Sequence, residues 1–153
     1  GSMIRNVSFE KTTYAAPPER FEAGTPNIAG AIGLGAAIDF LDRIDLAAVQ
    51  LHEADLVEYA SRRLAGIPGV RLIGTARERA GLVSFVVGDV HAHDVGTILD
   101  GEGIAVRAGT HCAQPILARF GLQSTVRPSF AFYNTRDEMD VLVGALREIS
   151  SRR

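Results

Sequence analysis

The fold is decided at the stretch GIPGVRLI, residues 66–73, where the sequence changes from helical to mixed character. Gly66 closes a helical pattern, and Pro68-Gly69 is typical of a turn. From Val70 the apolar period shortens to that of a strand, and a second short apolar run, Leu82–Val87, follows a polar turn. These two runs predict neighbouring strands of one small sheet.

Toward the N-terminus the sequence predicts two helices. The first follows Asn27 and has many small residues between its apolar positions, which permits close packing. The second begins near Asp45, a plausible N-cap, and runs to Gly66. Residues 4–27 carry Pro17-Pro18 and no sustained period, so we expect extended segments and loops there. The expected buried stripes are Ile28, Ile32, Ile38 and Leu41, and then Leu46, Val49, Leu56, Ala60 and Leu64.

Toward the C-terminus short elements alternate. We expect helices near 94–101 and 116–120, strands at 104–107 and 125–132, and a loop at 108–115. The last helix begins at the capping box Thr135-Arg136-Asp137-Glu138, in which hydroxyl and carboxylate satisfy free backbone donors. The fold class predicted is therefore α+β: a small, largely antiparallel sheet with helices covering one face.

Composition excludes several functions. The chain has 153 residues, 46% of them apolar, which is enough for one buried core. A net charge of -2 provides no basic field for nucleic acid or an anionic membrane, and no apolar run approaches the roughly 20 residues that span a bilayer. We therefore expect a cytoplasmic protein with neither partner. The single cysteine excludes an internal disulfide and any multi-thiolate metal site built by one chain.

Three other patterns carry less weight. Residues 33–37 are rich in glycine, but no strand precedes them, so they indicate helix packing and not a dinucleotide loop. The run His91-Ala92-His93-Asp94 has two possible metal ligands but no third nearby, and a capped, solvated turn explains it equally well. His52 shares a helical face with apolar residues, which favours a structural role.

The segment VRAGTHCAQP, residues 106–115, is the strongest candidate site, because it places Cys112 in a loop beside His111 and five residues after Arg107. A lone cysteine is more often a small buried hydrophobe than a nucleophile. Cationic neighbours, however, favour the thiolate, and a glycine-bearing loop can move a sulfur toward a substrate. Arg127 lies in an otherwise apolar strand, where it either reaches solvent or holds an anion such as a carboxylate.

Three segments in register carry a family resemblance: residues 20–27 (RFEAGTPN), residues 107–115, and residues 127–135 (RPSFAFYNT). Together they resemble the group II, SUF-type cysteine desulfurases of the aminotransferase class V, fold-type I pyridoxal phosphate (PLP) family. The resemblance covers the native chain but only the C-terminal part of that longer family protein. Gly1-Ser2 before Met3 is typical of a cleavage scar, so we expect a scar and start at residues 1–3. The resemblance implies a remnant of the large PLP-binding domain at 4–27, a connecting helix at 28–44 and a C-terminal small domain at 45–153.

Site residues follow from the same resemblance. Cys112 matches the persulfide-forming cysteine, and Arg127 matches the arginine that holds the substrate carboxylate. Thr25 matches a threonine that reaches the cofactor phosphate of the partner subunit, while Arg107 and His111 match substrate-side loop residues. No metal is implied. This chain departs from the family at Thr110, usually histidine, and at Pro128, usually alanine, which removes a backbone donor beside the arginine.

The implied activity is conversion of L-cysteine to L-alanine, with sulfur passed from a Cys112 persulfide to an acceptor protein for iron–sulfur cluster assembly. The full-length enzyme would be a PLP-dependent homodimer. The chain alone is expected to bind no PLP and to be inactive, because its only lysine, Lys11, lies outside the family segments. Alternatives are a selenocysteine lyase, a cysteine sulfinate desulfinase, or a noncatalytic module that docks a sulfur acceptor or a second copy of itself.

Overall fold

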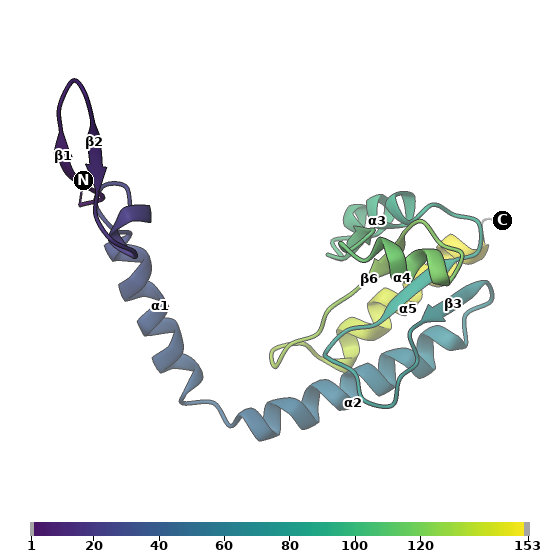
Figure 1. The fold of residues 1–153 in the computed structure, drawn as a ribbon. Coiled ribbons are helices and arrows are strands. Elements are labelled where there is room, and N and C mark those ends of the chain that lie inside the picture. Colours follow the sequence, from purple (N-terminus) through teal and green to yellow (C-terminus); the bar gives the residue numbers. More distant parts are fainter. Residues whose placement is uncertain (1, 152–153) are drawn as a thin grey trace. The chain divides into compact units, whose positions relative to one another are not determined.

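A computed structural model describes residues 2–151; Gly1, within the predicted scar, and Arg152–Arg153 lie outside the described residues. The chain divides into two units, one up to Asp45 and one from Leu46 (Figure 1). Within the described residues, no helix is both long and apolar enough to cross a membrane.

The first unit is a hairpin followed by a helix. Strands β1 (Ile4–Val7) and β2 (Thr12–Tyr14) pair antiparallel, and a single 3-10 turn, η1 (Glu19–Phe21), follows. Helix α1 (Ile28–Leu41) begins where the Asn27 Oδ1 accepts a hydrogen bond from the Gly30 amide at 2.9 Å. The predicted helix is confirmed, but its predicted stripe is not buried: α1 has no buried residue within this chain. A helix that is apolar on all sides is normally covered by further protein.

The second unit holds the sheet and the core. Its elements are α2 (Leu46–Ala65), β3 (Val70–Ile73), β4 (Ser84–Val87), α3 (Ala92–Gly101), β5 (Arg107–Gly109), α4 (Gln114–Arg119), β6 (Thr125–Arg127) and α5 (Arg136–Ser151). The strand order is β3-β4-β6-β5, and every neighbouring pair is antiparallel. The predicted α+β class is confirmed.

Strand alternation sends one face of the sheet into the core. Phe85 of β4 is opposite Val126 of β6, and both are fully buried. They join a cluster with the apolar stripes of α2, α3 and α5, so these three helices cover one face as predicted. Leu117 of α4 is buried outside that cluster and lines the hollow described below. Thr125 and Arg127 of β6 point to the opposite face from Val126, because side chains alternate along a strand.

Several predicted boundaries are wrong, for local reasons. The strand expected at 104–107 lies at 107–109, because Ile104 donates its amide to the Leu99 carbonyl at the end of α3 and pairing with β6 starts only at Arg107. The strand expected at 82–87 begins at Ser84, and the one expected at 125–132 ends before Pro128, which has no amide hydrogen to continue the ladder. The helix expected at 116–120 begins at Gln114.

Two predicted local features are confirmed. At the start of α5 the Glu138 Oε2 accepts the Thr135 amide at 2.8 Å, and the Thr135 hydroxyl accepts the Glu138 amide at 3.4 Å. His52 is a satisfied structural histidine, since its Nε2 lies 2.9 Å from the Asn134 carbonyl oxygen.

Candidate functional site

Cys112 lies in a tight turn between β5 and α4. The Ala113 amide donates to the Thr110 carbonyl at 2.9 Å, and the two central residues, His111 and Cys112, have φ of 53° and 56°. Positive φ at both central positions is a feature of type I′ turns, which favour glycine, asparagine and aspartate. Two side-chain-bearing residues in this conformation store strain of a kind that concentrates at functional sites. The Cys112 thiol is free and exposed.

Two arginines face each other beside this turn. Arg107 on β5 is the direct cross-strand partner of Arg127 on β6. Like charges opposite each other destabilise a strand pair. Among residues 2–151 neither guanidinium has an ion-pair partner, and the buried Nε of Arg127 has no hydrogen-bond partner. Such a pair is suited to an anionic ligand, and a carboxylate matches the guanidinium fork.

His111 is anchored to β6. Its Nε2 lies 3.0 Å from both the backbone oxygen and the hydroxyl oxygen of Thr125. Burial lowers the pKa of His111 below its ordinary value, and the positive charges of Arg127 and Arg107 lower it further, whereas the hydrogen bond to the Thr125 backbone opposes the shift. The net shift favours the neutral form of the His111 ring.

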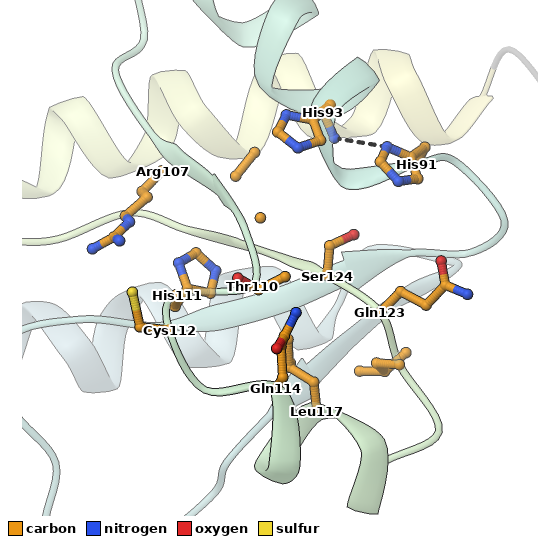
Figure 2. Close-up of a pocket in the computed structure, with 13 residues that line it drawn as sticks. His91, His93, Arg107, Thr110, His111, Cys112, Gln114, Leu117, Gln123 and Ser124 are labelled. Atoms are coloured by element: carbon orange, nitrogen blue, oxygen red, sulfur yellow. Dashed lines mark hydrogen bonds between the residues drawn. The ribbon is translucent and has the colours of Figure 1, made fainter.

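Cys112, His111 and Arg107 line an open hollow of about 740 Å³ (Figure 2). Figure 2 shows the Cys112 sulfur, the His111 ring and Arg107 gathered at one side of it. His91 and His93 lie at the start of α3, and α4 contributes Gln114 and Leu117. The hollow thus combines a thiol, an imidazole and a guanidinium, which together can bind an anionic molecule and attack it with sulfur.

The structure brings three of the five predicted site residues into this hollow, namely Cys112, His111 and Arg107. Arg127 is not in its lining, but its register opposite Arg107 and its effect on the His111 pKa place it next to the others. Thr25 belongs to the first unit, where it lies in the loop 22–27 that surrounds a smaller hollow.

Sequence reasoning missed two further contributions. Thr125 and Ser84 support His111 from the sheet, but only their polar character within apolar strands could have drawn attention to them. His91 and His93 line the hollow, and His91 caps α3 by accepting the His93 amide at 3.3 Å, so this helix begins before the expected Asp94. Among residues 2–151, no three metal-ligating side chains are grouped to hold an ion.

Comparison with known proteins shows what the chain is similar to. Probable cysteine desulfurase 1 of Mycobacterium leprae is 53% identical over 150 residues, covering 98% of this chain and 24% of that protein. A cysteine desulfurase of Synechococcus elongatus is 53% identical over 151 residues, covering 99% of this chain and 24% of that protein. The solved apo structure of a cysteine desulfurase from Thermococcus onnurineus NA1 is 41% identical with a TM-score of 0.84, covering all of this chain and 38% of that one.

The chain thus spans about a quarter of the length of these two curated relatives and over a third of the solved structure. A family model described as Aminotransferase class-V matches residues 1–142, which is most of the sequence and includes the turn, both arginines and Thr25. The chain therefore belongs to the aminotransferase class V family.

Proposed function

We propose that this chain is the C-terminal part of a PLP-dependent cysteine desulfurase and that Cys112 is its sulfur carrier. The observation that carries the proposal is the geometry of the Cys112 turn: an exposed thiol in a strained turn, next to two arginines that have no anionic partner among residues 2–151. The relatives named cysteine desulfurase, at about half identity, supply the reaction class.

The residues present fit the amino-acid substrate. Arg127, with its unpartnered Nε, is suited to the carboxylate of L-cysteine, and Cys112 to its sulfur. They do not supply the lysine amine that holds PLP, since Lys11 is exposed beside the first hairpin. That lysine would lie in the longer protein, where PLP, when bound, acts as an electron sink. Thr25 would contact the cofactor phosphate of a partner subunit.

Sulfur transfer follows from the thiol and its surroundings. The Cys112 thiolate attacks the sulfur of L-cysteine; an S–S bond forms and the C–S bond of the substrate breaks. The electron pair of that C–S bond stays with the carbon fragment, which takes up protons and leaves as L-alanine. Arg107 and Arg127 hold the carboxylate of the substrate during the attack.

Exposure of Cys112 allows the second transfer. A thiolate of an acceptor protein attacks the outer sulfur of the persulfide, and Cys112 leaves as a thiolate. We assign the transferred sulfur to iron–sulfur cluster assembly in the cytoplasm. We also assign the complete enzyme as a homodimer. These assignments rest on the resemblance to SUF-type desulfurases.

The test uses the longer protein that contains this chain. Cys112→Ser should leave PLP absorbance and L-cysteine binding intact while nearly abolishing alanine and persulfide formation. A variant of an exposed α4 residue that does not line the hollow, Ile116→Ala, is the matched control and should turn over normally. Competition among L-cysteine, L-selenocysteine and cysteine sulfinate separates the desulfurase from the lyase and the desulfinase. Unchanged turnover by Cys112→Ser would refute the proposal.

A further inference from the structure

Thr125 is a buried polar residue at a junction of side chains. Only 1% of its surface is exposed, and its hydroxyl lies on the sheet face opposite the hydrophobic core. The Ser84 hydroxyl donates to Thr125 Oγ1 at 2.8 Å from the neighbouring strand, and His111 Nε2 lies 3.0 Å from the same oxygen. Burying a hydroxyl is unfavourable unless it is hydrogen-bonded. The hydrogen bonds of this junction satisfy the buried hydroxyl and connect the sheet to the Cys112 turn.

The junction determines which ring nitrogen of His111 carries the proton. A carbonyl oxygen only accepts hydrogen bonds, and the Thr125 carbonyl lies 3.0 Å from Nε2. Nε2 must therefore be the donor. Thr125 Oγ1 has two lone pairs, so it can accept from both Ser84 and His111 Nε2. The opposite tautomer would set a nitrogen lone pair against the carbonyl and would leave a buried Nδ1–H without an acceptor.

The remaining nitrogen of His111 is then a bare acceptor. Nδ1 is buried and has no hydrogen-bond partner among the described residues. Arg107 and Arg127 face the ring from β5 and β6, Cys112 follows it in the turn, and His91 and His93 line the same hollow. Burial and the two guanidinium charges lower the pKa of His111, so the lone pair on Nδ1 stays available at neutral pH.

We propose that Thr125 and Ser84 are positioning residues that hold His111 in the Nε2–H tautomer, so that Nδ1 is a hydrogen-bond acceptor in the site that contains Cys112. No proton is transferred in this arrangement. The tautomer and its two supports, Thr125 and Ser84, do not depend on the proposed function.

The experiment measures the tautomer directly, on the 153-residue chain labelled with ¹⁵N-histidine. Long-range ¹H–¹⁵N correlation spectra at neutral pH distinguish a protonated from a bare ring nitrogen, and the His111 signals are identified by their loss in His111→Gln. We expect a bare Nδ1 and a protonated Nε2. Thr125→Val keeps the shape but removes the hydroxyl, and we expect it to raise the exchange rate of the Nε2 proton about fivefold, the factor for one neutral hydrogen bond.

Thr125→Ser is the matched control, because it restores the hydroxyl and should restore the wild-type exchange rate. Ser84→Ala should raise the rate in the same direction by a smaller factor, and it keeps the test decisive if the valine variant does not fold. A wild-type His111 with the proton on Nδ1, or an unchanged exchange rate in Thr125→Val and Ser84→Ala, would overturn the inference. Because no turnover is measured, a failed desulfurase proposal would leave this result unaffected.

Discussion

Replacing Cys112 with glycine should make the protein more stable while removing its reactive atom. The left-handed conformation costs an L-residue about 1–2 kcal/mol, and Cys112 adopts it with φ of 56°. Glycine relieves that strain, but its greater freedom in the unfolded state lowers the unfolding free energy by about 0.4–1 kcal/mol. Because the Cys112 side chain is exposed, no buried contact is lost. The net expectation is a gain in unfolding free energy of about 0.5–1 kcal/mol relative to Cys112→Ala, which keeps the Cβ atom.

The assay is urea unfolding followed by the methyl resonances of Leu99, a fully buried residue of the second unit. With a slope of about 2 kcal/mol per molar urea, Cys112→Gly should unfold at a midpoint about 0.3–0.5 M above that of Cys112→Ala. Ala118→Gly is the contrasting control: it lies exposed in α4 and should lower stability by about 1 kcal/mol. If both glycine variants have a lower unfolding free energy, the turn stores no strain, and strain no longer supports a functional role for this turn.

Three further outcomes are expected. Phe85→Ala, at a side chain with no exposed surface, should destabilise the second unit by about 3–5 kcal/mol in the same assay, whereas the exposed Ile116→Ala should change stability by less than about 0.5 kcal/mol. Folding lowers the pKa of His111, so its contribution to stability is present above the ordinary pKa of 6.5 and is lost as pH falls through 6.5 toward the folded value. His111→Gln should remove this part of the profile of unfolding free energy against pH. An identical profile in the variant would contradict the prediction. In the longer protein, Arg127→Ala should weaken L-cysteine binding by about 2–5 kcal/mol with little rescue by lysine, as measured by titration, and unaltered binding would make the residue structural.

Local sequence signals predicted the elements well where the interactions are themselves local. The capping box predicted at Thr135 forms between residues three apart, and the helix predicted after Asn27 begins at Ile28. The strand at 107–109 was misplaced because Ile104 and Val106 alternate like strand residues and pack against the core without entering the ladder. Apolar alternation indicates burial; it does not determine which residues pair.

The site was predictable only in part, for a related reason. Cys112, His111 and Arg107 are close in sequence, so one segment identified them. The support of His111 depends on Thr125, which lies 14 residues away, and on Ser84, which lies 41 residues from Thr125. No periodicity connects such positions. The positive φ of His111 and Cys112 was also hidden, because φ above zero is uncommon for any residue that bears a side chain, although histidine adopts it more often than most.

Pro128 has a structural consequence that bears on the position of Arg127. Having no amide hydrogen, Pro128 ends the β6 ladder, although its carbonyl still accepts the Val83 amide at 3.3 Å. A second hydrogen bond to the 81–83 segment follows at Phe130, whose amide donates to the Gly81 carbonyl. Arg127 is thus the last residue of a strand that is fixed on both sides of the proline. Because side chains alternate along a strand, this fixed strand end places Arg127 on the same sheet face as Thr125, which contacts His111.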